Sequence, residues 1–212
     1  MSKALVAENI SKRYGTGSYV IHDLSHTFKP GTATGLIGPN GSGKTTFLRL
    51  VSTTAFPTSG SVHYGDLNIH DAPGKYLQHV GLVSDSTGLP EYLTAEELLS
   101  WILRSRNQWD EESEKRIHNL LEAVSLDERR ENLIGTYSSG MMQKTLIAAS
   151  LIARPDIILL DEPFRALDVD STERTINLLT EFRDNGGTIL ISSHIRSTLD
   201  RLCEDYLEFP VK

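Results

Sequence analysis

Hydrophobic and polar residues alternate over the first part of the chain in the way that is typical of short β-strands. The segments 4–10, 19–24 and 25–29 follow this pattern and are separated by glycine- and proline-containing turns. A brief apolar segment at 34–37 then leads into a glycine-rich loop at 38–45. The pattern therefore predicts a β-rich N-terminal part that ends in this loop.

The pattern becomes helical after the loop. Residues 45–53 place Phe47, Leu48 and Val51 on one face, which predicts a helix. A further strand is predicted at 80–83.

The middle of the chain is predicted to be helical. Thr94 and Glu97 form a capping-box signature ahead of an apolar stripe at 98–103. A second, charged helix is predicted at 111–124. Residues 89–136 thus form a helical insert between β-rich parts.

In the C-terminal part, helices alternate with short apolar strands. Helices are predicted at 141–152 and 171–184, and buried strands at 157–160 and 188–192. Strands that alternate with helices indicate a mostly parallel sheet covered on both faces, so the predicted fold class is α/β.

The chain has 212 residues and a formal net charge of -7. This length suits one large domain or two small ones, and the composition is ordinary for a globular protein. The negative charge argues against a nucleic-acid partner, which would need a basic surface. The single cysteine, Cys203, leaves no intrachain disulfide, and no apolar run reaches the roughly 18–20 residues of a membrane span or resembles a signal peptide. We therefore expect a cytoplasmic protein.

The loop at 38–45 has the pattern Gly-x-x-x-x-Gly-Lys-Thr, a Walker A loop in its expected place between a strand and a helix. Backbone N–H groups of such a loop converge on phosphates, and the following helix adds its positive end. Lys44 adds a charge that is expected to act in binding and catalysis, and the Thr45 hydroxyl is a candidate Mg²⁺ ligand. The expected nucleotide-contacting residues are Gly38, Pro39, Asn40, Gly41, Ser42, Gly43, Lys44, Thr45 and Thr46.

Two carboxylates follow the strand predicted at 157–160. Asp161 and Glu162 would reach the carboxyl edge of the sheet, where open α/β folds bind ligands. Asp161 fits the role of a Mg²⁺ ligand, and Glu162 fits that of a general base that polarises water for attack on the γ-phosphate. Acidic residues also end strands as turn formers, which is the alternative for both.

A second glycine-bearing loop, at 137–143, lies well downstream of the first. One loop is enough to hold a nucleotide, so we expect Ser138 and Gly140 of the second loop to close a site on another copy of the chain. An N-capped helix without a ligand is the alternative.

These motifs, in this order and spacing, resemble the nucleotide-binding domain of ABC transporters: the Walker A loop, the Ser-Ser-Gly sequence at 138–140 and the segment 157–163. The resemblance covers essentially the whole chain, so 1–212 is expected to be one such domain. It implies a P-loop core with a mostly parallel sheet, an antiparallel β subdomain at the N-terminus, and an inserted helical subdomain at about 89–140.

The resemblance assigns roles to further residues. Tyr14 matches the aromatic residue that stacks on adenine, and His194 matches the histidine that contacts the γ-phosphate during catalysis. Asp168 matches a loop that couples the two sites across a dimer. The alternatives are a strand-end tyrosine, a structural histidine, and an aspartate that caps the helix at 171–184.

The second loop departs from the family motif, which is normally Leu-Ser-Gly-Gly-Gln. Ser139 replaces a glycine and Met141 replaces the glutamine. Methionine cannot make the strong hydrogen bonds of glutamine. This variant resembles that of ABC-2-type exporters. If Ser139 stood in a left-handed conformation meant for glycine, it would cost about 1–2 kcal/mol.

A further departure is at Asp85, where the family usually has a glutamine that reaches Mg²⁺ and the attacking water. A carboxylate can also bind Mg²⁺, so Asp85 joins Thr45 and Asp161 as a candidate metal ligand. A solvated turn aspartate is the alternative.

The resemblance implies an ATP-binding and ATP-hydrolysing subunit that uses Mg²⁺ and powers an ABC transporter of the exporter type. The implied partners are a second copy or a related ATPase subunit, and integral membrane permease subunits at the cytoplasmic face of the membrane. Leu89, Tyr92, Leu93 and Trp101 are candidates for the permease contact, with packing inside the helical subdomain as the alternative. A soluble ABC ATPase outside transport and a nucleotide-binding regulatory module are the alternative functions.

Overall fold

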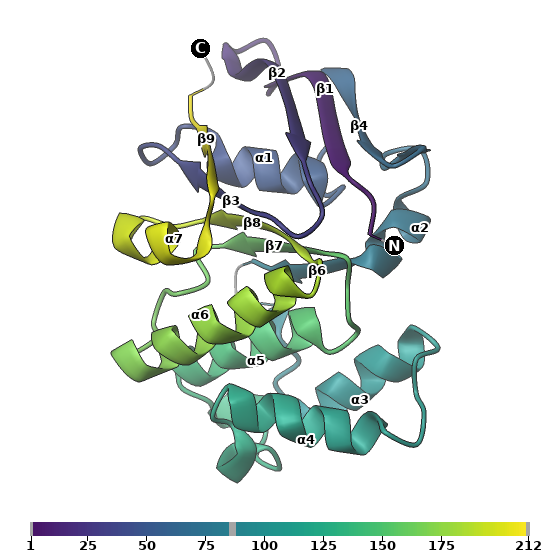
Figure 1. Ribbon diagram of the computed structural model, residues 1–212, viewed down its shortest axis with the longest axis vertical. Helices are drawn as coiled ribbons and strands as arrows, with labels where there is room; N and C mark the ends of the chain where they lie inside the picture. The colour runs from purple at the N-terminus through teal and green to yellow at the C-terminus, as the bar shows by residue number, and fades with distance from the viewer. Residues whose placement is uncertain (1, 85–87, 211–212) are drawn as a thin grey trace.

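The structure, a computed structural model, describes residues 2–84 and 88–210. Figure 1 shows one helix, α1, between an antiparallel sheet and a parallel sheet, with the other long helices beyond the parallel sheet. The strands are β1 (Leu5–Arg13), β2 (Tyr19–Phe28), β3 (Ala33–Ile37), β4 (Ser59–Tyr64), β5 (Leu67–Asn68), β6 (Val80–Val83), β7 (Ile157–Asp161), β8 (Thr188–Ser192) and β9 (Asp205–Glu208). The helices are α1 (Lys44–Val51), α2 (Pro73–Tyr76), α3 (Ala95–Ser105), α4 (Ser113–Ala123), α5 (Ser139–Leu151), α6 (Val169–Asp184) and α7 (Arg196–Leu202).

The antiparallel sheet has the strand order β2-β1-β4-β5. The strand β2 is continuous from Tyr19 to Phe28, so the prediction of two strands at 19–24 and 25–29 is wrong. The pairing of β1 with β2 contains register shifts, and the buried residues of β2 are therefore not spaced by two. In the sequence, this irregular spacing of apolar residues looks like a break between two strands.

The strands β4 and β5 were not predicted. Only Val62 and Tyr64 are buried in β4, and β5 has two residues. Neither segment carries enough alternating apolar residues to be recognised as a strand without its partner.

The parallel sheet has the strand order β6-β7-β8-β3-β9, and its neighbouring strands pair in parallel throughout the described residues. The four buried strands of this sheet lie within one residue of their predicted bounds. The edge strand β9 and the short helix α7 were not predicted, because β9 is only partly buried and α7 has two turns. The predicted α/β fold class, with one antiparallel and one mostly parallel sheet, is confirmed.

The parallel sheet separates two hydrophobic layers. Ile158 and Leu160 of β7 belong to the layer that also contains α5 and α6, whereas Ile157 and Leu159 belong to the layer around α1. Because successive side chains of a strand point to opposite faces, an uninterrupted apolar run fills both layers at once. The sheet is thus fixed in place, and its carboxyl edge carries the polar residues at the ends of β7 and β8.

The helices α3 and α4 lie at the end of the molecule farthest from the antiparallel sheet (Figure 1). The predicted capping box is present: the Thr94 hydroxyl oxygen accepts from the N–H of Glu97 (3.1 Å), and a Glu97 carboxylate oxygen accepts from the N–H of Thr94 (2.9 Å). The buried residues of α3 and α4 pack with those of α5 in one cluster, which joins this helical part to the parallel sheet.

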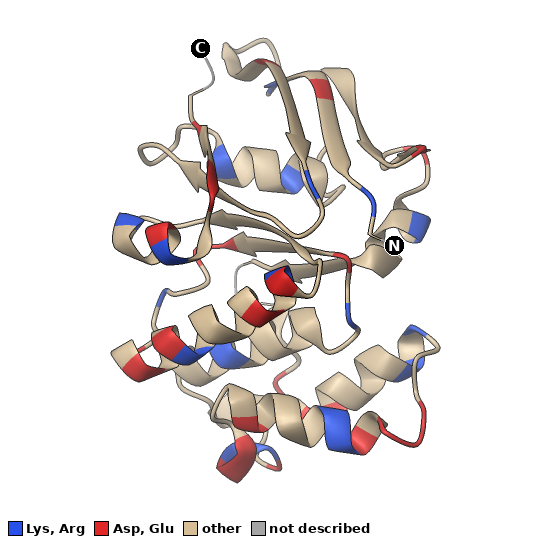
Figure 2. Ribbon diagram, viewed as in Figure 1, with Lys and Arg blue, Asp and Glu red and all other residues tan. Residues whose placement is uncertain are grey.

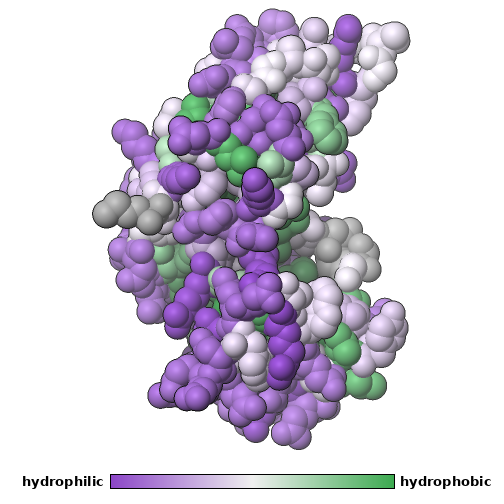
Figure 3. Space-filling view, turned by 90° about the vertical axis from the view of Figure 1, so that its right-hand side faces the viewer, coloured by the Kyte–Doolittle hydropathy of each residue, from purple (hydrophilic) through white to green (hydrophobic). Residues whose placement is uncertain are grey.

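The surface is mixed in charge and mostly hydrophilic. In the view of Figure 2, acidic and basic residues are interspersed over the sheets and helices. On the face in Figure 3, the hydrophobic areas are small and separate. Among the described residues, no helix is both long enough and apolar enough to cross a bilayer.

Candidate nucleotide-binding site

The loop between β3 and α1 is shaped by its glycines. Gly38 and Gly43 have positive φ angles of 141° and 114°. A Cβ atom on Gly38 would lie 2.2 Å from the carbonyl oxygen of Phe209, so no larger residue fits there without displacing the C-terminal segment. The loop therefore passes close to the backbone of Phe209 near Gly38 and of Val20 near Gly43.

Lys44 is the first residue of α1 and is only 7% exposed. Its ammonium group donates hydrogen bonds to the carbonyl oxygens of Gly38 (2.7 Å) and Pro39 (3.0 Å). The helix has no side-chain cap, so the N–H groups of its first turn remain available to an anion. A lysine charge and a helix N-terminus thus converge at one point.

A cavity of about 170 Å³ lies at that point. It is lined by Asn40, Gly41, the residues 43–46, the pair at 161–162, and His194. The structure therefore brings the loop together with both predicted carboxylates and the predicted histidine, although these residues come from three distant parts of the chain.

Ser192 holds the ends of β7 and β8 together. Its hydroxyl donates to a carboxylate oxygen of Asp161 (2.6 Å) and accepts from the N–H of Glu162 (3.1 Å). The sequence analysis did not assign a role to Ser192. A polar residue at the end of a fully buried strand was the available signal, because parallel strand ends meet at one sheet edge.

Glu162 and His194 form a pair across this edge. The His194 ring nitrogen Nε2 lies 3.1 Å from Glu162 Oε1, and the His194 N–H donates to Glu162 Oε2 (3.2 Å). Glu162 also has a φ of 51°, a left-handed conformation that is costly for a residue with a side chain. The carboxylate of Glu162 therefore lies next to His194 at the edge of the 170 Å³ cavity.

The site offers oxygen ligands that suit Mg²⁺. Thr45 and Asp161 line the same cavity, and Mg²⁺ typically takes one or two protein ligands together with phosphate and water oxygens. Among the described residues no group of three histidine, cysteine or carboxylate side chains could hold a metal ion by itself. The donor set thus fits a metal ion that enters with a phosphate ligand. The third predicted ligand, Asp85, lies outside the described residues.

The second loop leads into α5. The Ser138 hydroxyl caps this helix by accepting from the N–H of Met141 (3.3 Å). Ser139 is the first helical residue and is not among the residues with positive φ, so the predicted strain from a left-handed Ser139 is absent. Ser138 and Gly140 do not line the 170 Å³ cavity of their own chain.

Tyr14 and Asp168 also stand outside that cavity. Tyr14 is 52% exposed just after β1, and the Lys12 ammonium lies 5.0 Å from its ring centroid. Asp168 caps α6 by accepting from the N–H of Ser171 (2.7 Å). Hydrogen bonds from the backbone N–H and the hydroxyl of Ser171 lower the pKa of Asp168. The capping role of Asp168 is therefore present, and a second role across a dimer stays a prediction.

The four residues predicted to contact a permease differ in exposure. Tyr92 is 82% exposed and Trp101 63% exposed. Leu89 packs against the hydrophobic core, and Leu93 is half-buried. Packing inside the chain therefore accounts for Leu89, whereas the two aromatic side chains are available to a partner.

Comparisons with known proteins agree with this geometry. The family model described as "ABC transporter" matches residues 21–165. The linearmycin resistance ATP-binding protein LnrL of Bacillus subtilis strain 168 is 32% identical over 200 residues, which are 94% of this chain and 64% of that protein. The bacitracin transport ATP-binding protein BcrA of Enterococcus faecalis is 30% identical over 205 residues, 96% of this chain and 65% of that protein. The chain thus spans just under two thirds of the length of these two relatives.

A solved structure described as the ATP binding subunit of an ABC transporter superposes with a TM-score of 0.90 at 28% sequence identity. The similarity covers 97% of this chain and 85% of the other. With a family model that matches well over half of its residues, the chain belongs to the ABC transporter family, as an ATP-binding domain of that family.

Proposed function

We propose that this chain binds and hydrolyses ATP and thereby powers an ABC transporter of the exporter type. One observation carries the proposal: the glycine-rich loop, Lys44, both carboxylates and His194 line a single phosphate-sized cavity. The names of LnrL and BcrA support the exporter direction, because one is a resistance protein against linearmycin and the other a bacitracin transport protein.

The loop binds the triphosphate. N–H groups of the loop and of the N-terminus of α1 donate hydrogen bonds to the β- and γ-phosphates. When ATP binds, the Lys44 ammonium donates its hydrogen bonds to phosphate oxygens instead of the carbonyl oxygens of Gly38 and Pro39. Charged phosphate oxygens are stronger acceptors for a charged donor. The exposed ring of Tyr14 offers a face on which adenine stacks.

Thr45 and Asp161 hold Mg²⁺ together with the phosphates. When bound, the ion neutralises negative charge that develops on the phosphate oxygens. Ser192 keeps one oxygen of Asp161 in place by its hydrogen bond. The Asp161 carboxylate therefore meets the ion in a fixed orientation.

Glu162 orients the attacking water. Its carboxylate pairs with His194 at the edge of the cavity, so both side chains are within reach of a γ-phosphate and the water behind it. Glu162 accepts a hydrogen bond from the water, and His194 then contacts the γ-phosphate. The left-handed backbone at Glu162 keeps the carboxylate in position.

The site closes on a second copy. Ser138 caps the N-terminus of α5, and neither Ser138 nor Gly140 lines the 170 Å³ cavity of the same chain. In a pair of chains related by a two-fold axis, this N-terminus completes the phosphate site of the opposite copy. A homodimer, or a dimer with a related ATPase subunit, is the active form. Permease subunits receive the exposed Tyr92 and Trp101 at the cytoplasmic face of the membrane.

The experiment is steady-state phosphate release from ATP and Mg²⁺ by the full chain. We expect turnover that is lost in Lys44→Ala and in the absence of Mg²⁺. Binding of ATP without phosphate release would instead identify a nucleotide-binding regulatory module. Failure to bind ATP at all would contradict both functions.

A further inference from the structure

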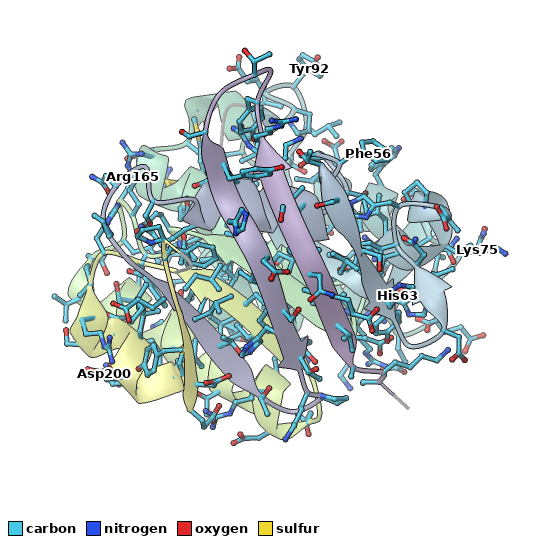
Figure 4. All side chains as sticks on the ribbon, turned by 90° about the horizontal axis from the view of Figure 1, so that it is seen from above. Phe56, His63, Lys75, Tyr92, Arg165 and Asp200 are labelled. Atoms are coloured by element: carbon cyan, nitrogen blue, oxygen red, sulfur yellow. The ribbon has the colours of Figure 1, made fainter. Side chains whose placement is uncertain are left out.

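Arg165 stands on a tight turn between β7 and α6. The Arg165 N–H donates to the carbonyl oxygen of Glu162 (3.1 Å), and both Glu162 and Ala166 have positive φ angles, 51° and 67°. This backbone turns the Arg165 side chain away from the core. Figure 4 shows Arg165 at the margin of the molecule, on the side opposite Lys75.

The guanidinium group of Arg165 has no carboxylate within ion-pair distance among residues 2–84 and 88–210. Arginines of the neighbouring elements do: Arg183 pairs with Glu204, and Arg201 with Glu173. Arg165 lines a cleft of about 850 Å³ that Glu162 and Ser139 also line. The exposed charge of Arg165 therefore lies near both Glu162 and the second loop.

The turn that carries Arg165 is packed directly on the second loop. A Cβ atom on Gly140 would lie 2.8 Å from the carbonyl oxygen of Ala166. The backbones of the two segments at Gly140 and Ala166 are therefore in direct contact, with no side chain between them. Arg165 and Ser139 accordingly border the same cleft, so a ligand at the second loop lies near Arg165.

We propose that Arg165 binds the γ-phosphate of the ATP held by the opposite copy, an inference that rests on the two-copy site under Proposed function. Arginine presents a fork of N–H donors that matches phosphate oxygens. It acts beside the start of α5, because Arg165 and Ser139 line one cleft. The charge of Arg165 adds an attraction for phosphate to the one that the N-terminus of α5 supplies.

The test uses the full chain with Glu162→Gln, which slows hydrolysis, and measures the dimer dissociation constant by sedimentation velocity with ATP or ADP and Mg²⁺. Adding Arg165→Ala should weaken the ATP dimer by about 10–100-fold, the usual effect of a hydrogen bond to a charged group. The dissociation constant of the ATP dimer with Arg165→Lys should lie between those with Arg165 and with Arg165→Ala. Arg174→Ala is the matched control, because Arg174 is exposed on α6 and lines neither cavity.

ATP affinity of the monomer, titrated at concentrations below those that give dimers, should be unchanged in Arg165→Ala. Weaker binding to the monomer would place Arg165 on its own nucleotide and overturn the proposal. An equal loss of dimer in ATP and ADP would assign Arg165 to a protein carboxylate and overturn it as well, as would a loss no larger than that of Arg174→Ala. If Glu162→Gln alone fails to dimerise with ATP, the two-copy site itself is wrong, and the role of Arg165 falls with it.

Discussion

At the scale of single residues, the site depends on contacts that tie the ends of two strands together. Ser192 bridges Asp161 and the backbone of Glu162, and Glu162 in turn meets His194. None of these contacts lies within a contiguous motif. They set the orientation of the carboxylates, whereas the motif residues set which chemistry is available.

Replacing Ser192 by alanine should impair the site more than the fold. The substitution removes the hydrogen bond that orients Asp161, so we expect Mg²⁺-dependent phosphate release to fall by about 10–100-fold. Titration of Mg²⁺ against turnover measures the effect. Ser105→Ala is the control, because that exposed hydroxyl bonds only within α3. Equal turnover in both variants would show that Asp161 needs no support from Ser192.

Cys203 should be unreactive while the chain is folded. Burial raises the pKa of its thiol to about 12, and only the thiolate reacts with disulfide reagents. Because this pKa lies above its usual range, reactivity should be very low at pH 8 and increase as the pH rises. We expect slow reaction with an aromatic disulfide reagent in buffer and rapid reaction in denaturant. Rapid reaction of the folded chain would contradict the burial of this residue.

At the scale of elements, uninterrupted apolar runs were the most informative part of the sequence. The strands β7 and β8 were predicted almost to the residue, because a strand covered on both faces consists of apolar residues throughout. The strands β4, β5 and β9 could not be predicted, since they are short or half-buried and owe their conformation to the strands beside them. Sequence spacing also indicated the Walker A loop and the carboxylates.

The sequence could not indicate how distant residues meet. Glu162 and His194 are far apart in the chain, and their contact follows from the parallel pairing of β7 with β8. The proximity of Arg165 to the second loop likewise depends on how the turn after β7 packs on α5. Both are tertiary results that no local pattern contains.

The capping box of α3 should stabilise the helical part locally. Thr94→Ala removes the side-chain acceptor for the N–H of Glu97 and should cost about 1 kcal/mol. Hydrogen exchange in the first turn of α3 should become faster by a corresponding factor. Glu112→Ala at the start of α4 is the matched control, because Glu112 makes no side-chain cap bond. If both variants exchange alike, the capping box contributes nothing to α3.

At the scale of the whole molecule, the proposed two-copy site uses two regions of each chain, the small cavity and the second loop. The cavity at 38–46 has the charge and the carboxylates, while the capped N-terminus of α5 lies outside it. In the proposed pair of chains related by a two-fold axis, each copy contributes its cavity to one site and its second loop to the other. The proposed coupling to transport depends on this arrangement, because closure and opening of such a pair would move a membrane partner.

The state of association of Glu162→Gln, measured by sedimentation velocity with ATP and Mg²⁺, tests this claim most directly. The variant keeps the loop, Lys44 and the second loop but loses the carboxylate that polarises water, so bound ATP persists. We predict a dimer with ATP and a monomer with ADP, and loss of the ATP dimer when Ser138→Ala is added. A Glu162→Gln chain that binds ATP and remains monomeric at high concentration would contradict the two-copy site.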